Sequence, residues 1–369
     1  MALTLSDVKE IFEPEIQRWA RPRHGFITEI LFGGMPKKID GMSVGWDEIK
    51  KYATVAPLYG NHTSAVERIK EGGEQKTFDL AFYKSKATLR DSEGMARLLG
   101  TTQFSDQKQA ENIAVAMLEI LKDQYEEIAR RKDLLCISAA WNSYLDLVGY
   151  GVDKRVTFYR PPALDITLAP ADQWAINGTV NIPLQFNNLK LLFQKESMSG
   201  VINGAIMNST TAQKFITNTE IKSLRKTNDG WTQGTVGIDD SMLADMGVQK
   251  LGIVENIEVF SFDYWYEEEV GGVMVTKNAI PDNEVMFFSK TDVTAKNQIY
   301  AGTPPISMAY DSPLFQGFGH FKKVQNPNNN NISVMGIKGD LDNMALHFVS
   351  MSAETPIIKK VSTMRVKVA

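Results

Sequence analysis

The longest apolar pattern in the chain predicts one very long helix. After Ser105, which is placed to cap the helix, apolar residues recur every three or four positions as far as Leu145, the spacing of one helix face. Gly149 and Gly151 are the residues that would stop this pattern. We therefore expect a helix over about 105–147, and about forty residues at ~1.5 Å each make a rod of ~60 Å.

Alternating polar and apolar positions predict strands before that helix. Residues 64–70 alternate, Gly72 and Gly73 supply a turn, and a second extended run continues to Arg90. We expect a long β-hairpin over 61–90 that projects into solvent or onto a neighbour, because few large apolar residues lie near its turn. Against four acidic residues it carries six basic ones, which are Arg68, Lys70, Lys76, Lys84, Lys86 and Arg90.

The second half of the chain is predicted to contain an α+β unit over about 181–305. Strands are expected at 200–207, 257–265, 273–275 and 284–288. Asn208 is placed to cap a helix at 212–226, and the glycines at 271–272 are placed in a turn. Just before this unit, residues 152–167 are predicted to form a strand pair that two prolines interrupt.

The two ends of the chain differ in character. Prolines and glycines interrupt residues 1–60 repeatedly, and the apolar groups there are too few and too dispersed to offset the entropy of ordering them. We expect this segment to be an arm that drapes over another surface. The last segment, 344–369, is rich in valine, isoleucine and methionine and is expected to return as strands of a sheet, with a bend at Pro356.

Composition and charge exclude several classes of protein. The 369 residues are 43% hydrophobic and 23% charged, which is ordinary for a globular protein with more than one core. The net charge of −4 gives no global attraction to nucleic acid. The basic cluster at Arg18, Arg21 and Arg23 is therefore either a local DNA-facing patch or a surface patch paired with acidic groups.

Two further features bear on where the protein is made. The single cysteine, Cys136, excludes an intrachain disulfide framework. No stretch is long and apolar enough for a membrane span, and the start does not resemble a secretory leader. We expect a protein made and kept in a cytoplasm, with no membrane partner.

No catalytic, metal or cofactor site is predicted. Ser43 lies in a G-x-S-x-G pattern typical of serine hydrolases, but the strand before it and the helix after it are lacking, and a turn in the arm is the favoured interpretation. None of the four histidines lies four residues from another, and the acidic segment 340–343 lacks the glycine and glutamate of a calcium loop. Neither a dinucleotide fingerprint nor a phosphate-binding loop occurs.

Three consecutive aromatic residues, Tyr264, Trp265 and Tyr266, would suit the stacking of nucleotide bases. The glutamates at 267–269 follow directly, and their negative charge would repel phosphates. Packing within a strand is therefore the favoured explanation of the aromatic residues.

Several short stretches, taken in order, resemble a known family. They are VAPLY at 55–59 with ERIKEGG at 67–73, SGVIN at 199–203, IPDN at 280–283, and the ending 352–369. They resemble, respectively, the entry into an extended loop, the strand before an axial-domain helix, a Leu-Pro-Asp-Asn turn and a last strand of the lambda-type major capsid protein family, which has the Hong Kong 97-type fold. Ile280 replaces the leucine of that turn, and Glu354 and Thr355 replace more apolar residues of the last strand.

The resemblance implies an α+β capsid fold in five parts. These are an N-terminal arm (1–60), an extended loop (61–90), a peripheral domain with the spine helix (91–180), an axial domain (181–305), and a peripheral return with the C-terminal strand (306–369). The six basic residues of the extended loop become candidates for contacts between subunits.

The function implied is that of a non-enzymatic major capsid protein without cofactors, which assembles as pentamers and hexamers into an icosahedral shell around the genome of a tailed double-stranded DNA phage. The implied partners are other copies of the chain, a separate scaffolding protein, a portal protein and DNA held by weak non-specific contacts, with a decoration protein as a further candidate. The implied location is the virion, after assembly in the host cytoplasm. Three alternatives stay open: an encapsulin-like or prophage-derived compartment shell, a tail-tube protein, and a serine hydrolase acting through Ser43.

Overall fold

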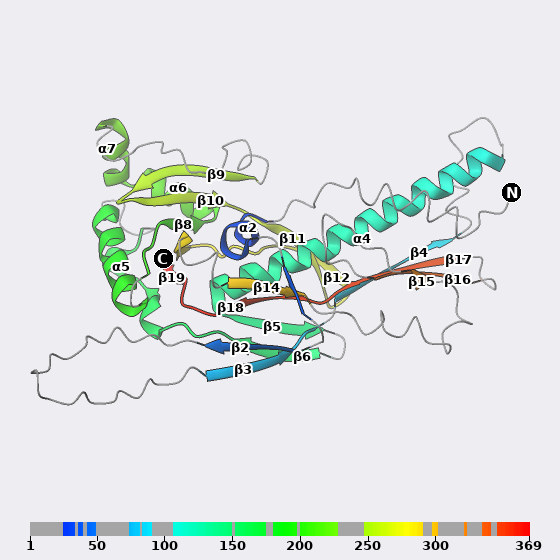
Figure 1. Cartoon of the computed structure of the whole chain (residues 1–369). Coiled ribbons are helices and arrows are strands. Elements are labelled where there is room, and N and C mark those ends of the chain that lie inside the picture. The colour runs from blue at the N-terminus through cyan, green and yellow to red at the C-terminus, as the bar shows by residue number, and fades with distance from the viewer. Residues whose placement is uncertain are drawn as a thin grey trace, which may run out of the picture.

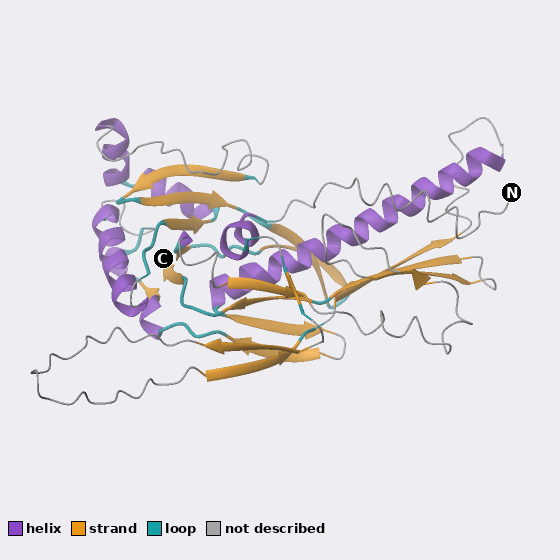
Figure 2. Cartoon of the chain, viewed as in Figure 1, coloured by secondary structure: helices purple, strands orange, loops and turns teal. Residues whose placement is uncertain are grey.

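The structure is a computed structural model of the chain. It describes residues 25–33, 36–39, 43–48, 74–81, 83–90, 106–149, 152–174, 180–197, 200–227, 247–290, 297–301, 321–322, 334–340 and 345–369. Figure 1 shows a long helix, α4, that runs from a region of sheet and short helices toward the opposite end of the molecule. In Figure 2 the helices α5 and α7 lie at the end of the molecule away from the far end of α4.

A six-stranded mixed sheet forms the core of the region at that end. Its strands, in spatial order, are β7 (Asp165–Thr167), β19 (Thr363–Lys367), β13 (Glu284–Phe288), β8 (Gly204–Met207), β10 (Ile257–Phe262) and β9 (Val248–Val254). The helices α5 (Ile182–Ser197), α6 (Ser209–Thr217) and α7 (Thr219–Thr227) belong to the same region. The C-terminal strand β19 pairs with β13 on one side and with β7 on the other inside this sheet.

The predicted long helix is present as α4 (Asp106–Asn142), whose 37 residues make a rod of about 55 Å. It ends earlier than expected because Ser143 has a left-handed backbone, with φ 58°. The following residues form β5 (Tyr144–Gly149), which pairs with β6 (Val152–Thr157). None of the described helices is long and apolar enough to cross a membrane.

The strand pair expected over 152–167 differs in its pairing. The strands β6 and β7 both exist, but β6 pairs with β5 and β7 pairs with β19. Between them the chain passes Pro161 and a short 3-10 helix, Pro162–Leu164, and a second one follows at Pro170–Asp172.

The hairpin expected over 61–90 also differs in its pairing. The strand β3 (Glu74–Asp79) is antiparallel to β2 (Ser43–Glu48), so the described base of the extended loop begins at Ser43. The segment 64–70 lies outside the described residues. The strand β4 (Tyr83–Arg90) belongs to another sheet, because it pairs along its length with β17 (Ala345–Ser352). That sheet continues through β16 (Val334–Asp340) to β15 (Phe321–Lys322).

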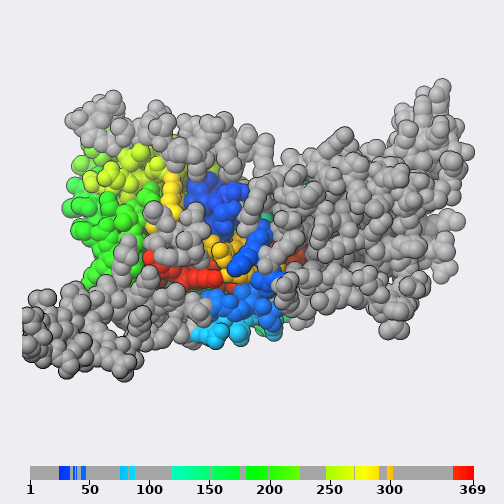
Figure 3. Space-filling model, in the orientation of Figure 1, coloured from blue at the N-terminus to red at the C-terminus, as the bar shows by residue number. Residues whose placement is uncertain are grey.

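The N-terminal segment is not only an arm. The helix α2 (Phe26–Phe32) buries Phe26, Ile27 and Leu31, and the Phe26 ring lies 5.1 Å from the Phe260 ring. The strand β1 (Lys37–Lys38) pairs with β14 (Asn297–Ala301), which pairs with β18 (Glu354–Ile358). Figure 3 shows residues near the N-terminus, in blue, lying beside C-terminal residues in red. The helix α2 is therefore part of the subunit's own core, and β1 is part of one of its sheets.

Several local predictions are confirmed. Asn208 caps α6, since its side chain accepts a hydrogen bond from the Thr211 backbone N–H. The helix expected over 212–226 is present in two pieces, because the chain breaks at Asn218 between α6 and α7. The glycines at 271–272 have positive φ and join β11 (Trp265–Val270) to β12 (Val273–Asn278).

Candidate assembly interface

The serine hydrolase alternative does not fit the structure. Ser43 is an exposed residue at the start of β2, and its hydroxyl donates to Asp79 Oδ1 on β3 at 2.7 Å. A nucleophile elbow needs a sharp turn from a strand into a helix, whereas Ser43 opens a strand in an antiparallel pair. Among the described residues, no group of three or more histidine, cysteine, aspartate or glutamate side chains is placed to hold a metal ion.

The base of the extended loop is fixed to the β5–β6 hairpin. Trp46 of β2 is buried, and its ring lies 6.2 Å from the ring of Phe158. Lys76 of β3 donates to the Thr157 backbone oxygen at 3.3 Å, and Lys154 lies 3.8 Å from the Asp79 carboxylate. Lys76, one of the six basic candidates, therefore binds within its own subunit.

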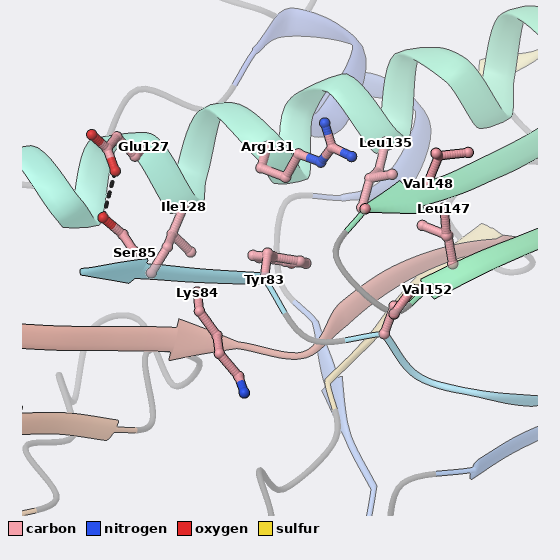
Figure 4. A pocket seen from close by; sticks show the side chains of 12 residues that line it. Tyr83, Lys84, Ser85, Glu127, Ile128, Arg131, Leu135, Leu147, Val148 and Val152 are labelled. Atoms are coloured by element: carbon pink, nitrogen blue, oxygen red, sulfur yellow. Dashed lines mark hydrogen bonds between the residues drawn. The ribbon is translucent and has the colours of Figure 1, made fainter. Parts of the chain in front are cut away.

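Two other candidates, Lys84 and Lys86, are exposed on β4. Between them, Ser85 turns toward α4, where its hydroxyl donates to Glu127 Oε2 at 2.5 Å. Since neighbouring residues of a strand point to opposite faces, both lysines turn away from α4, and Figure 4 shows Lys84 doing so. Neither lysine has an ionic partner within the described part of the chain.

A groove of about 630 Å³ opens between β4, α4 and the β5–β6 hairpin. Much of its wall is apolar, and the apolar residues there include Tyr83, Ile128, Leu135, Leu147, Val148 and Val152. Leu147 is buried, but Val148 is 65% exposed. Together with the apolar wall of the groove, Val148 forms an open apolar surface of the kind that contacts other molecules.

The remaining predicted site residues are not tested. Arg68 and Lys70, the cluster at Arg18, Arg21 and Arg23, and three of the four histidines lie outside the described residues. Arg90 ends β4, but its side chain is among those that the structure leaves out. The structure places Lys76 in the β2–β3 pair and Lys84 and Lys86 in the β4–β17 sheet, so they do not share one hairpin.

The C-terminal end of the spine helix is tied to the six-stranded sheet by Arg160. Its guanidinium donates to the backbone oxygens of Trp141 and Ala140 at 2.9 and 2.6 Å, and to the Thr363 hydroxyl at 2.8 Å. A cation at this end of a helix is stabilised by the helix dipole. Burial lowers the pKa of Arg160 to about 10, which leaves it charged at neutral pH. The Trp141 indole also donates to Glu284 Oε2 at 2.7 Å.

A buried charged cluster lies in the C-terminal third of α4, and sequence reasoning missed it. Asp133 accepts hydrogen bonds from the Gly25 backbone N–H at 2.8 Å and the Thr28 hydroxyl at 2.6 Å, which joins α2 to α4. Burial raises the pKa of Asp133. The neighbouring Lys132 lies 3.3 Å from Glu354 of β18, with both side chains buried. These contacts make the helix and the surrounding strands one rigid support for the exposed surfaces.

Comparison with known proteins identifies the family. A model of the family described as Phage major capsid protein E matches residues 21–313, most of the chain. No curated protein matches the chain significantly in sequence. Because this family consists of phage capsid proteins, the compartment-shell, tail-tube and hydrolase alternatives are not favoured.

Solved structures show the same fold. The putative capsid protein of a prophage from E. coli CFT073 is 13% identical, covers 100% of both chains and has a TM-score of 0.68. The mature capsid of bacteriophage PhiM1 is 8% identical, covers 93% of this chain and 86% of that chain, and has a TM-score of 0.50. The predicted Hong Kong 97-type α+β fold is confirmed. The chain therefore belongs to the phage major capsid protein E family, and it is a shell-forming head protein of a tailed phage rather than an enzyme.

Proposed function

We propose that the chain assembles as pentamers and hexamers into an icosahedral head, and that Lys84, Lys86 and the adjacent groove contact a neighbouring subunit. The observation that supports this is a surface with two exposed lysines next to an open apolar groove. Capsid proteins form oligomeric shells, so in the assembled state another copy is available to cover such a surface.

The proposed mechanism of assembly is the summation of many weak non-covalent contacts. An exposed ion pair contributes only ~0.2–1 kcal/mol, and a shell is stable because each subunit makes many such contacts in a closed symmetric arrangement. The buried ties of Asp133 and Arg160 keep α4 fixed to both sides of the subunit, which supports maturation by movement of whole subunits between two packings. We include the extended loop, and Arg68, Lys70 and Arg90, among the contacts to an adjacent subunit.

The partners and location proposed for the chain follow from the family. They are a separate scaffolding protein, a portal protein and packaged double-stranded DNA, with a decoration protein as a further candidate. The basic cluster at Arg18, Arg21 and Arg23 is the proposed contact to DNA, which it would hold weakly and without sequence preference. Assembly takes place in the host cytoplasm before the protein becomes part of the virion.

Charge reversal on β4 tests the proposed contact. The double substitution Lys84→Glu with Lys86→Glu is expected to leave soluble, folded subunits that form few shells in negative-stain electron microscopy. The matched control, Lys84→Arg with Lys86→Arg, keeps both charges and is expected to assemble as the wild type does. Normal shells from Lys84→Glu with Lys86→Glu would show that this face of β4 makes no essential contact.

A further inference from the structure

The β11–β12 hairpin is a two-stranded sheet that pairs with no other strand in the described part of the fold. Ribbons of two strands are marginally stable alone and need a surface against which to pack. One face of the hairpin is turned toward α4, since Tyr266 and Glu268 line a cleft with Ser138 and Asn142 of that helix, and Val273 and Val275 at its edge stay 64% and 38% exposed. On this inner face, Glu268 pairs with Lys277 at 2.9 Å.

The opposite face of the hairpin, here called the outer face, carries Trp265, Glu267, Glu269 and Met274. We expected Trp265 to pack within a strand, but it is 64% exposed, and Met274 is 60% exposed. Glu267 and Glu269 are also exposed and have no ionic partner among the described side chains. A tryptophan and a methionine next to two unpaired carboxylates form the kind of surface that binds another protein.

The β4 strand carries a surface of matching pattern. Lys84 and Lys86 lie two residues apart on one strand, as Glu267 and Glu269 do, so each pair spans about 7 Å. The register sets Met351 opposite Lys84 and Val349 opposite Lys86 on β17.

We propose that the outer face of the β11–β12 hairpin docks on the β4–β17 face of a second copy of the chain, with Glu267 and Glu269 against Lys84 and Lys86. This inference rests on the proposed function, and it names the partner surface of the two lysines. Both faces turn away from α4 in their own subunit. Because the two faces are different patches of one chain, the contact is head-to-tail, and such contacts close into rings when the rotation between subunits permits.

The charges of the hairpin favour a second copy over nucleic acid as the occupant. Glutamates at 267–269 would repel a phosphate backbone, whereas a pair of lysines at the same spacing attracts them. Trp265 and Met274 add apolar area that a hydrated DNA backbone would not cover.

Charge exchange between the two faces tests the inference. Glu267→Lys with Glu269→Lys, and separately Lys84→Glu with Lys86→Glu, should each weaken the subunit contact by about tenfold or more, because two attractions become two repulsions. The variant with all four substitutions should restore shells to within about twofold of the wild-type yield, because each attraction is re-formed with the charges exchanged. Shells are counted by electron microscopy and sedimentation, and folding is checked by circular dichroism. Exchanging Glu268 and Lys277 on the inner face is the control, and it should leave assembly unchanged.

The outcomes separate the two proposals. If each double variant fails to assemble and the variant with all four substitutions fails too, the docking partner is wrong while the β4 contact stands. If Glu267→Lys with Glu269→Lys assembles normally, the docking inference is overturned. If Lys84→Glu with Lys86→Glu assembles normally, both proposals are overturned.

A second measurement uses the unaltered chain and does not depend on how the variants fold. Carbodiimide treatment of wild-type shells should join residue 84 or 86 of one copy to residue 267 or 269 of another, as peptide mass spectrometry would show. Unassembled subunits treated in the same way should lack these linked peptides. Shells that also lack them would overturn the inference.

Discussion

Replacing Arg160 by methionine should weaken the joint between the spine helix and the six-stranded sheet. The substitution keeps a long side chain but removes the charge and all three hydrogen bonds that the guanidinium donates, to Trp141, Ala140 and Thr363. Two of these acceptors are carbonyl oxygens in the last turn of α4, and the Ala140 oxygen keeps the Thr363 hydroxyl as a donor at 3.0 Å.

The expected loss can be worked from these contacts. A hydrogen bond from a charged donor contributes ~1.5–3 kcal/mol, and three such bonds are not additive because they share one charge. Methionine also avoids the cost of burying a guanidinium, which offsets part of the loss. We therefore expect the free energy of unfolding to fall by about 2–4 kcal/mol, a large share of the ~5–15 kcal/mol that is typical of a folded protein.

Urea denaturation of unassembled subunits, followed by circular dichroism, measures this difference. Arg160→Lys keeps the charge without the planar fork, so it should lie between the wild type and the methionine variant. Arg155→Met is the matched control, because the Arg155 side chain is exposed: it pairs with Asp146 and lies 4.5 Å from the centre of the Tyr144 ring, both in the β5–β6 hairpin. Exposed contacts of this kind contribute ~1 kcal/mol or less, so its midpoint should move much less than that of Arg160→Met. An Arg160→Met midpoint equal to that of the wild type would refute the proposed joint.

Three further predictions concern pH, assembly and the N-terminal helix. The Arg365 guanidinium lowers the pKa of Asp165 below 3.8, so this carboxylate stabilises the fold above pH 3.8 and loses that effect as the pH falls through its lowered pKa. Asp165→Asn should therefore lower the urea midpoint at neutral pH and progressively less in acid, and an equal effect at both would contradict the ion pair. Reversing Arg68 and Lys70 to glutamate should impair assembly of folded subunits, and normal particles by electron microscopy would count against their role. Deleting residues 1–33 removes the buried side chains of α2 and should cost several kcal/mol relative to a chain that begins at residue 25; equal midpoints for the two truncations would mean that α2 adds no stability.

The long helix could be predicted from sequence because its apolar face repeats for about eight turns, but its end could not. Leu145 lies four residues after Trp141 and continues the helix pattern, yet Leu145 and Leu147 also alternate as residues of a strand do, and both are buried in β5. Leu145 therefore fits both the spacing of a helix and the alternation of a strand. The structure resolves the ambiguity through the pairing of β5 with β6, which follows after a two-residue gap.

Strand pairing was predictable only where a tight turn joins the partners. The β11–β12 turn was found because Gly271 and Gly272 mark it. The partners of β3 and β4 lie far away in sequence, and no local signal indicates that β4 pairs with β17 rather than with β3. A hairpin was therefore the simplest interpretation of residues 61–90, although the chain builds two separate sheets there.

The alternation of residues along β4 could show that Lys84 and Lys86 lie on one face. It could not show the buried charges of α4 and β18, which hold the subunit together beneath the candidate interface. Lys132 follows Arg130 and Arg131, and a run of three basic residues is typical of the exposed C-terminal turn of a helix. A signal was present, since Lys132 lies midway between Ile128 and Cys136 on the buried face of the helix. A charged residue at such a position indicates a buried partner, and Glu354 became identifiable as that partner only once the fold placed β18 beside α4.

The position of β19 has a consequence for how subunits are made. Residues 363–367 fill the place between β13 and β7 in the six-stranded sheet. During synthesis, β13 therefore has no neighbour on that side until nearly all of the described chain has been translated. A prematurely terminated chain would expose an unpaired strand edge and would be a target for proteases and chaperones. We therefore expect the six-stranded sheet to be complete only in subunits whose synthesis has passed residue 367.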